Sequence, residues 1–489
     1  MKIKDIIKNI DYSSCSYFAD DEINSICFDS RKIKPGDVYF ALKGEQDGAQ
    51  FASDAVQKGA VLVVSDRDLP GLPCLVVSDP RKVMTEFCAE KYGHPEKQVK
   101  MIGVTGTNGK TTTAYILWQL YNSLGVKAAF IGTLGAFVGS DMIETGMTTP
   151  DPPTFFSLLS RFVAMGVQVV VCEVSAHAIY LQKVINVPFK YGVFTNLTPD
   201  HLDYFNDLAF YGDVKKSWLI SSLVKKAVLN YDDDITKEIL SNRKGKTITY
   251  MLGSAKDKNE IKAPKDYYAI NVQSGEKTSF SLCATGKNYF VESPLVGLFN
   301  VKNLLAALAV LLDDDIPAEE VINSVKTIQP PPGRFNQTEC CGKKVIVDYA
   351  HTPDGLKNVL ETAKAITKGE LLCVFGCGGN RDREKRPTMG KIAAEISDAV
   401  VITSDNPRWE DPTAIMNEIL SGVDDRERNK CVSIVDRAEA IRYAVDRAGQ
   451  DDLIVVAGKG AEEYLEIRGK RIFYSDYDVL KKLDCRIKP

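Results

Sequence analysis

The sequence predicts a three-domain α/β protein, and three observations support this fold class. The chain has 489 residues, which corresponds to about three domains at roughly 150 residues each. Short apolar runs that end in polar or glycine-rich turns alternate with helical stretches, a pattern typical of mostly parallel, doubly wound sheets. Three consecutive prolines in QPPPGRFNQ, at residues 329–337, cannot continue a helix and predict a linker.

We expect the domains to span residues 1–98, 99–328 and 329–489. The first is a small α/β unit whose strands include AVLVVSD and CLVVSD. The second opens on the strand, turn and helix of VKMIGVTGTNGKTTTAYILWQL and continues with VQVVVCEVS, YGVFTNL and KAVLNYD. The third contains KKVIVDYAH, ELLCVFGCG, AVVITSD and LIVVAGKG. Because ligands collect at the carboxyl ends of parallel strands, the polar residues that end these runs are candidate functional residues.

The composition and the N-terminus exclude several classes of protein. Apolar residues make up 44% of the chain and charged residues 26%, and the net charge of −4 argues against a general nucleic-acid binder. The start MKIKDIIKNI lacks the apolar core of a signal peptide, and no run of about 18 apolar residues predicts a membrane span. We therefore expect a cytoplasmic protein whose twelve cysteines are reduced. A zinc site is disfavoured, because the four histidines are far apart in the sequence.

A glycine-rich turn joins a strand to a helix at GVTGTNGKTTT, residues 103–113. Glycines let the backbone curl round phosphates, and the helix N-terminus supplies free N–H groups and a positive dipole end. Lys110 adds a cation for the β- and γ-phosphates, and Thr111 a hydroxyl for Mg²⁺. The usual phosphate loop has a glycine where this chain has Val104, so this is a variant P-loop. Its predicted nucleotide-binding residues are Gly106, Thr107, Asn108, Gly109, Lys110, Thr111 and Thr112.

Two further polar residues follow buried strands. Glu173 ends the strand of VVVCEVSAH, and His201 lies in TNLTPDHLDYF. Because nucleotide-bound Mg²⁺ needs one or two protein ligands near the phosphates, both residues are candidate metal ligands beside Thr111. Two alternatives stay open, namely a carboxylate that satisfies a helix N-terminus at Glu173 and a capped loop histidine at His201. The spacing of the lysines in FYGDVKKSWLI, residues 210–220, indicates nothing beyond surface positions.

Eight motifs in this order resemble the Mur ligases, and most closely their MurE branch, which joins a diamino acid to a UDP-linked muramoyl dipeptide. The resemblance covers nearly the whole chain and rests on GVTGTNGKTTT, EVSAH, FTNLTPDHLDYF, GLFNVKN, PGRFN, DYAHTPDGL, GCGGNRDREKRP and DNPRWEDP. It implies a small N-terminal UDP-binding domain, a central ATPase domain and a C-terminal Rossmann-like domain that binds the amino acid.

The resemblance also implies the residues that carry the ATP chemistry. Asn300 and Asn303 match asparagines near the nucleotide base, and the third domain would bring Arg334, Asp348 and His351 to ATP. Similar ligases carbamylate a lysine four residues after a tyrosine, which is the spacing of Tyr211 and Lys215. The carbamate would bind a second Mg²⁺, although Lys216 leaves the assignment open by one position. The implied catalytic residues are Lys110, Lys215, His351 and Asp348, and the implied metal ligands are Thr111, Glu173, His201 and Lys215.

The same resemblance implies substrate-binding residues. They are Ser30 and Arg31 for the uridine diphosphate, Thr148, Thr149, Ser175 and Lys183 for the muramoyl dipeptide, and Arg381, Asp405, Asn406, Arg408, Gly458 and Glu462 for the added amino acid. The tetrapeptide DNPR, residues 405–408, is the form found in members that add meso-diaminopimelate. Its arginine offers a fork to the second carboxylate, which lysine lacks. The chain departs from the common family pattern at Ala176, Lys183 and Ala461, which puts the choice of amine in question.

The implied function is an ATP- and Mg²⁺-dependent amide ligase of peptidoglycan synthesis that works through an acyl phosphate and so serves cell shape and division. Its partners would be small molecules, with no nucleic acid or membrane, and it would act as a monomer. Alternatives are a lysine- or ornithine-adding ligase of the same family and a non-catalytic nucleotide-binding paralogue. A folylpolyglutamate synthase would lack a separate block like residues 1–98, and a P-loop GTPase or motor would leave the other motifs unexplained.

Overall fold

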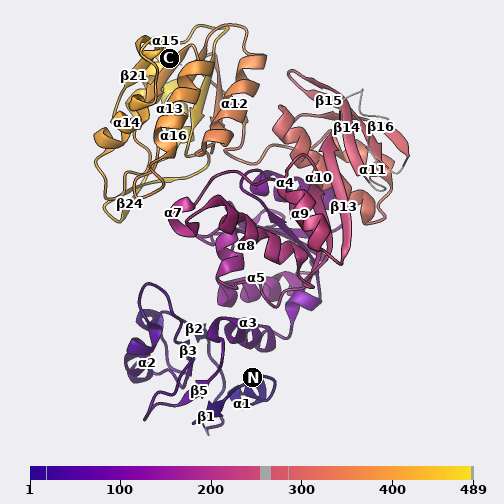
Figure 1. The fold of residues 1–489 in the computed structure, drawn as a ribbon, viewed down its shortest axis with the longest axis vertical. Coiled ribbons are helices and arrows are strands. Elements are labelled where there is room, and N and C mark those ends of the chain that lie inside the picture. The colour runs from indigo at the N-terminus through magenta and orange to yellow at the C-terminus, as the bar shows by residue number, and fades with distance from the viewer. Residues whose placement is uncertain (18, 254–265, 285, 486–489) are drawn as a thin grey trace.

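The computed structural model describes residues 1–17, 19–253, 266–284 and 286–485, and it forms three α/β units along the long axis of the molecule (Figure 1). The predicted ranges 1–98, 99–328 and 329–489 each contain one large sheet, while their exact boundaries stay a prediction. Within the described ranges, no helix combines the length and the apolar character needed to cross a bilayer. The α/β class with mostly parallel sheets is confirmed.

The N-terminal unit is built on a five-stranded sheet in the order β1-β5-β4-β3-β2, parallel except for β1. Its strands are β1 (Ser14–Cys15), β2 (Ile26–Cys27), β3 (Val38–Phe40), β4 (Leu62–Ser65) and β5 (Cys74–Val76). Its helices are α1 (Ile3–Ile7), α2 (Ala52–Gln57) and α3 (Pro80–Lys91). Every residue of β4 is buried, because helices cover both faces of the sheet, and this explains why AVLVVSD reads as a continuous apolar run.

The central unit has an eleven-stranded sheet in the order β16-β15-β14-β13-β12-β11-β6-β10-β7-β8-β9. Strands from β14 to β7 in this order pair in parallel, and antiparallel hairpins extend both edges. The strands are β6 (Lys100–Thr105), β7 (Ala128–Gly132), β8 (Gly135–Val138), β9 (Asp141–Ile143), β10 (Val169–Glu173), β11 (Phe189–Phe194), β12 (Val224–Asn230), β13 (Lys246–Leu252), β14 (Asp266–Ser274), β15 (Thr278–Ala284) and β16 (Lys287–Ser293). The predicted parallel centre is confirmed, and the edge hairpins are additional to it.

Helices cover both faces of this sheet, and one face also joins the N-terminal unit. They are α4 (Lys110–Ser123), α5 (Pro152–Ala164), α6 (Ala176–Tyr180), α7 (Leu202–Phe205), α8 (Leu208–Ile220), α9 (Ile235–Asn242), α10 (Leu298–Asp313) and α11 (Ala318–Val325). Apolar residues of α4, α10 and α11 fill one face. Phe155 of α5 and Trp218 of α8 fill the other, in one continuous cluster with Phe87 of α3. The first two units therefore share a hydrophobic core.

The C-terminal unit has a six-stranded sheet in the order β17-β18-β22-β19-β20-β21 and a separate hairpin. Its strands are β17 (Asn336–Cys340), β18 (Lys343–Asp348), β19 (Leu371–Phe375), β20 (Ala399–Ile402), β21 (Cys431–Ser433), β22 (Leu453–Ala457) and, in the hairpin, β23 (Tyr464–Ile467) and β24 (Lys470–Phe473). Its helices are α12 (Pro353–Ile366), α13 (Lys385–Ile396), α14 (Pro412–Ser421), α15 (Arg437–Arg447) and α16 (Asp476–Cys485). The predicted linker at 329–337 lies between α11 and β17 and reaches the first residues of β17.

The amino ends of four central strands meet a pair of aspartates at the end of α10. Asp313 accepts from Lys226 and Lys246, which are direct cross-strand partners, and from the hydroxyl of Tyr191. Asp314 accepts from Lys100, Lys190 and the hydroxyl of Tyr121, and its side chain is 2% exposed. Two neighbouring lysines on a sheet repel one another, and an aspartate that forms an ion pair with both offsets this repulsion. The aspartates thereby join α10 to the amino ends of these strands, while the candidate site lies at their carboxyl ends.

We predict that Asp314→Asn destabilises the protein by about 2 kcal/mol at neutral pH, because it leaves two partly buried lysines without their counter-ion. Burial acts against the charge of Asp314, but the hydrogen bonds from Lys100 and Lys190 outweigh it and hold its pKa below the usual range. A lowered folded pKa means that the contribution is complete above about pH 4 and is lost as the pH falls through the folded value. Denaturant unfolding of the wild type and the variant at several pH values measures this difference.

The matched control is Asp315→Asn, since Asp315 is the exposed neighbour with a positive φ that asparagine tolerates. Equal stability of Asp314→Asn and Asp315→Asn at neutral pH would contradict the prediction.

Candidate functional site

The loop between β6 and α4 requires glycine at two positions. Gly106 has a φ of 147°, and a Cβ there would lie 1.9 Å from Thr195 Oγ1. Gly109, the N-cap of α4, has a φ of 83°, and a Cβ there would lie 2.3 Å from Asn303 Oδ1. The loop therefore curls tightly against β11 and α10 and leaves the N-terminus of a fourteen-residue helix at its centre. Free N–H groups and the helix dipole make this end an anion site, as the sequence predicts.

Two lysines meet at one carbonyl of this loop. Lys110 Nζ donates to the carbonyls of Gly106 at 3.0 Å and Thr107 at 2.8 Å, and Lys215 Nζ donates to the same Gly106 oxygen at 3.0 Å. Burial lowers the pKa of Lys110, and burial together with the charge of Lys110 lowers that of Lys215 well below its usual value. Two ammonium groups in one buried place repel each other, so the site favours a bound anion or the loss of a proton.

The contacts distinguish the two adjacent lysines of α8. Lys215 is 1% exposed, and its ammonium lies 4.2 Å from the centre of the Tyr211 ring. Lys216 points to the other side of the helix and pairs with Asp213 at 2.6 Å and Glu238 at 2.9 Å, and hydrogen bonds to these two carboxylates raise its pKa. Only Lys215 faces the phosphate loop. The sequence left the choice between Lys215 and Lys216 open, and the contacts favour Lys215.

A fully buried carboxylate ends β10 beside the loop. Glu173 Oε2 accepts from Thr111 Oγ1 at 3.0 Å and from Thr133 Oγ1 at 3.3 Å, and its Oε1 accepts from the Thr133 N–H at 2.8 Å. A hydroxyl and a carboxylate beside a phosphate loop are the hard oxygen donors that Mg²⁺ prefers. The described residues contain no group of three or more His, Cys, Asp or Glu side chains arranged to hold a metal. This donor set therefore fits a metal that takes most of its ligands from phosphate and water.

Asp200 lies between two histidines from different domains. His201 Nε2 is 3.4 Å from Asp200 Oδ2, and His351 Nε2 of the C-terminal unit is 4.0 Å from the same oxygen. Burial lowers the pKa of His201 to about 3, so its imidazole is neutral at pH 7 and can act as a ligand or an acceptor. His351 Nδ1 lies 3.0 Å from the Tyr349 carbonyl, which fixes the orientation of its ring. The predicted His201 and His351 thus share a partner that the sequence did not indicate.

The linker and the third domain reach the phosphate loop directly. Arg334 donates to Thr111 Oγ1 at 3.3 Å, and its guanidinium lies 4.1 Å from the centre of the Tyr349 ring. Asn108 Nδ2 donates to Asp354 at 3.0 Å. Asp348 lies behind these contacts, because its carboxylate accepts the backbone N–H groups of Phe335 at 2.6 Å and Ala350 at 2.7 Å.

The structure thus places Arg334 and His351 at the loop, and it places Asp348 where it shapes the linker. Asn300 and Asn303 are buried in α10. Asn300 donates to the Val296 carbonyl at 2.8 Å, and Asn303 Oδ1 accepts from Thr113 Oγ1 at 3.3 Å. Their side chains bind the protein itself and brace the loop at Gly109. Thr112 is buried in the first turn of α4.

Polar residues continue from Glu173 along one side of the central unit. Thr149 Oγ1 donates to the Glu173 carbonyl at 2.8 Å and accepts from the Ser175 N–H at 3.1 Å. Thr148 Oγ1 lies 3.0 Å from Thr133 Oγ1, which in turn bonds Glu173. Lys183 pairs with Asp151 at 2.8 Å and donates to the Thr149 carbonyl at 3.3 Å. The structure thus brings the predicted dipeptide-binding residues 148, 149, 175 and 183 into one cluster beside the phosphate loop.

Ser30 and Arg31 lie apart from this cluster, in a 3₁₀ turn of the N-terminal unit. The Ser30 carbonyl accepts from Lys58 at 3.2 Å. Arg31 is exposed and pairs with Asp29 through two hydrogen bonds of 2.8 and 3.0 Å. These contacts present a fixed guanidinium at the surface of the domain.

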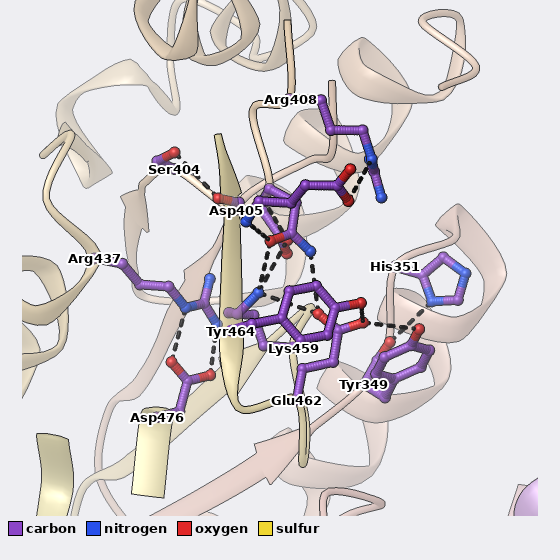
Figure 2. Close-up of polar contacts among 12 residues, drawn as sticks. Tyr349, His351, Ser404, Asp405, Arg408, Arg437, Lys459, Glu462, Tyr464 and Asp476 are labelled. Carbon is purple, nitrogen blue, oxygen red and sulfur yellow. Dashed lines mark hydrogen bonds and ion pairs between the residues drawn. The ribbon is translucent and has the colours of Figure 1, made fainter. Parts of the chain in front are cut away.

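The predicted amino-acid residues gather around a buried lysine in the third domain (Figure 2). Lys459 is fully buried and donates to Asn406 Oδ1 and Glu462 Oε2, each at 3.1 Å, with Asp405 Oδ1 at 3.7 Å. Asn406 Nδ2 also donates to Glu462 Oε2 at 3.1 Å. Gly458 has a φ of 111°, and a Cβ there would lie 2.6 Å from Asp405 Oδ2.

Burial acts against the charge of Asp405, but Lys459 and Arg437 outweigh it and hold its pKa below the usual range. Arg437 is itself fixed in a buried pair with Asp476 at 2.8 Å (Figure 2). A buried hydrogen-bonded network of this kind gives a rigid frame for a charged ligand.

Arg408 and Arg381 stand at the edge of this network. Arg408 donates to the Gly379 carbonyl at 2.8 Å and to Glu466 at 3.2 Å. A Cβ on Gly378 would lie 2.9 Å from Arg408 Nη1 and 3.7 Å from Arg381 Cγ, so both arginines border the same glycine turn. The structure therefore brings all six predicted amino-acid-binding residues to one region.

Sequence reasoning missed four residues of the site. Asp200 precedes His201 in the motif TPDHLDYF, and Lys459 stands inside the glycine turn GKG, so both had a usable signal. Asp354 and Glu466 had none, because Asp354 meets its partner 246 positions away and Glu466 meets Arg408 58 positions away.

The comparisons with known proteins cover the whole length of the chain. Residues 22–92 match the description Mur ligase family, catalytic domain; residues 104–311 match Mur ligase middle domain; and residues 333–460 match Mur ligase, glutamate ligase domain. A UDP-N-acetylmuramoyl-L-alanyl-D-glutamate–2,6-diaminopimelate ligase of Syntrophomonas wolfei is 38% identical, and the match covers 99% of each chain. The ligase of the same name from Aquifex aeolicus is 37% identical, over 94% of this chain and 93% of its own.

A solved structure that carries this ligase name shares the fold with a TM-score of 0.70 at 31% identity, over 99% of each chain. The MurF ligase of Thermotoga maritima, solved in complex with ADP, has a TM-score of 0.62 at 19% identity, over 88% of this chain and 93% of its own, and shows likeness of fold alone. The family matches and the two full-length relatives lead to one conclusion: the chain belongs to the Mur ligase family.

Proposed function

We propose that this protein is an ATP-dependent ligase that adds meso-2,6-diaminopimelate to UDP-N-acetylmuramoyl-L-alanyl-D-glutamate in peptidoglycan synthesis. The observation that carries the proposal is the meeting of Lys110 and Lys215 at the Gly106 carbonyl, beside a Thr111 hydroxyl that contacts both Glu173 and Arg334. This arrangement suits a triphosphate held between two domains. The two relatives described above carry the reaction in their names and match the chain over nearly its full length.

The first step is phosphoryl transfer from ATP. An oxygen of the substrate carboxylate attacks the γ-phosphorus, the bond to the β-phosphate oxygen breaks, and an acyl phosphate and ADP form. Lys110, the N–H groups of α4 and Arg334 bind the phosphates and balance their charge. Thr111 and Glu173, with His201 nearby, would hold Mg²⁺, which supplies further positive charge to the phosphates.

The second step is attack by the amine. Its nitrogen bonds to the acyl carbon, the bond to the phosphate oxygen breaks, and the amine loses a proton. His351 stands near the phosphate loop on the third domain, so a base from that domain is close to the reacting centre. The amino-acid cluster around Lys459 lies on the same domain, so closure of that domain brings both the amine and the base to the acyl phosphate.

Lys215 is suited to carbamylation. A carbamate forms when a neutral amine bonds to the carbon of CO₂ and releases a proton, so a lysine whose pKa burial lowers is the reactive form. The product carries a negative charge beside Lys110, which removes the repulsion between two ammonium groups at Gly106. It also adds a carboxylate-like ligand for a second Mg²⁺.

We predict that Lys110→Ala abolishes phosphate release, a loss of at least about a thousandfold, because it removes the cation that the phosphate loop itself places at the γ-phosphate. Release of phosphate from ATP in the presence of Mg²⁺, the UDP-linked dipeptide and diaminopimelate measures this. Near-normal turnover of the variant would remove the ligase assignment.

We predict that Lys215→Ala lowers turnover by about a hundredfold or more, while Lys216→Ala leaves it within about twofold, since only Lys215 faces the loop. Mass spectrometry of gently handled protein, with and without bicarbonate, tests the carbamate separately. Equal loss in the two variants would contradict the assignment.

We predict that the wild type turns over diaminopimelate in preference to L-lysine and L-ornithine, and that Arg408→Ala loses this preference by about tenfold or more, because a carboxylate loses its bidentate partner. Steady-state phosphate release with each amine provides the measurement. Wild-type preference for lysine would keep the family and overturn the role of Arg408, whereas no turnover with any amine would favour a non-catalytic paralogue.

A further inference from the structure

The hairpin β23–β24 holds the backbone of Arg408. Arg408 has a φ of 50°, in the left-handed region that few non-glycine residues adopt. Its N–H donates to the Glu466 carbonyl at 3.0 Å, and its own carbonyl accepts from the Arg468 N–H at 2.7 Å. Unusual backbone conformations persist where the surrounding structure fixes them. The hairpin therefore determines where this arginine stands.

The side chain of Glu466 holds the side chain of the same arginine. Glu466 Oε2 accepts from Arg408 Nε at 3.2 Å, and the Glu466 N–H donates to Asn406 Oδ1 at 2.9 Å. The side chains of Arg408 and Glu466 are 18% and 25% exposed, so water screens their attraction less than it would on an open surface. Glu466 thus binds two of the residues expected to hold the added amino acid.

Some N–H groups of the Arg408 guanidinium donate to the protein, and the others are available to a ligand. An arginine has five N–H bonds; here Nε donates to Glu466, and Nη1 gives one to the Gly379 carbonyl at 2.8 Å. Within the described residues, Nη2 has no protein acceptor. The Nη end, with hydrogens on both nitrogens, therefore remains for a bidentate carboxylate.

We propose that Glu466 determines amine specificity by positioning Arg408: it occupies the Nε edge of the guanidinium and so leaves the Nη end for the second carboxylate of the amine. The inference rests on the proposed function, and it adds a residue that touches no reacting atom. Glu466 is a positioning residue that acts through Arg408.

A competing role for Glu466 predicts the opposite effect on the binding of diaminopimelate. If Glu466 were a counter-ion that the substrate carboxylate had to displace, its removal would strengthen binding of diaminopimelate. The backbone bonds on both sides of Glu466 argue against displacement, because they keep the residue beside Arg408. The free Nη end also gives the substrate a place that needs no displacement.

The test is the KM for each amine in Glu466→Ala and Glu466→Gln, with wild-type protein in the full reaction. We expect Glu466→Ala to raise the KM for diaminopimelate about tenfold with little change in kcat and in the KM for lysine. Glu466→Gln should recover part of the loss, because its amide oxygen can still accept from Nε. A lower KM for diaminopimelate in Glu466→Ala, or equal effects on both amines, would overturn the proposal.

The matched control is Glu463→Gln, since Glu463 is an exposed glutamate on the same segment whose backbone carbonyl accepts from the Tyr474 N–H. In an Arg408→Ala background, Glu466→Ala should add no further loss of selectivity, and an added loss would show that Glu466 acts without Arg408. Wild-type turnover with diaminopimelate separates the two hypotheses: its absence defeats the proposed function, whereas its presence with an unchanged Glu466→Ala variant defeats this inference alone. Thermal unfolding of each variant shows whether it is folded.

Discussion

Two ammonium groups at one carbonyl oxygen, that of Lys215 buried and that of Lys110 partly buried, are the constraint on which the rest of the site depends. Lys110 comes from the first turn of α4 and Lys215 from α8, and both donate to Gly106. In water two such charges would cost little, but here burial lowers the pKa of both lysines, and the charge of Lys110 lowers the pKa of Lys215 further. A bound anion beside the pair, or the loss of a proton from one lysine, relieves this repulsion. A phosphate of ATP would supply such an anion, and the carbamate proposed for Lys215 would supply another.

The same constraint explains why the third domain must reach the loop. Its contacts are made by Arg334 with Thr111, by Asp354 with Asn108 and by His351 with Asp200. The linker that carries Arg334 is firmly held by its own domain, since a Cβ on Gly333 would lie 2.2 Å from the Ala461 nitrogen. Asp348 holds the same turn by accepting the Phe335 N–H, and it anchors its own end of β18 by accepting the Ala350 N–H. Arg334 therefore moves with the amino-acid cluster, and approach of the amine is coupled to contact with the phosphates.

Much of this arrangement could be predicted from the sequence, because it is local. A buried parallel strand is a short apolar run, and its polar end lies at the carboxyl edge of the sheet, so Glu173 and the glycine loop could be found from their neighbours alone. The choice between Lys215 and Lys216 could not, because both lie on one helix and only packing decides which is buried. The hairpins at the sheet edges were also missed, since their short strands carry a weaker periodic signal than the central ones.

The residues proposed to hold the amine could be selected from the sequence, but the contacts that orient them could not. Around Lys459 the structure collects three carboxylates, Asp405, Glu462 and Glu466, and two arginines, Arg408 and Arg381. Lysine and diaminopimelate share the distal ammonium group, so attraction of that group to the carboxylates does not discriminate between them. Discrimination needs one cation with a free edge at a fixed place, because a carboxylate gains most from a bidentate partner that is already oriented. Lys459 is enclosed by its own partners, whereas Glu466 orients the guanidinium of Arg408. Under the proposal above, selection of the amine depends on that orientation.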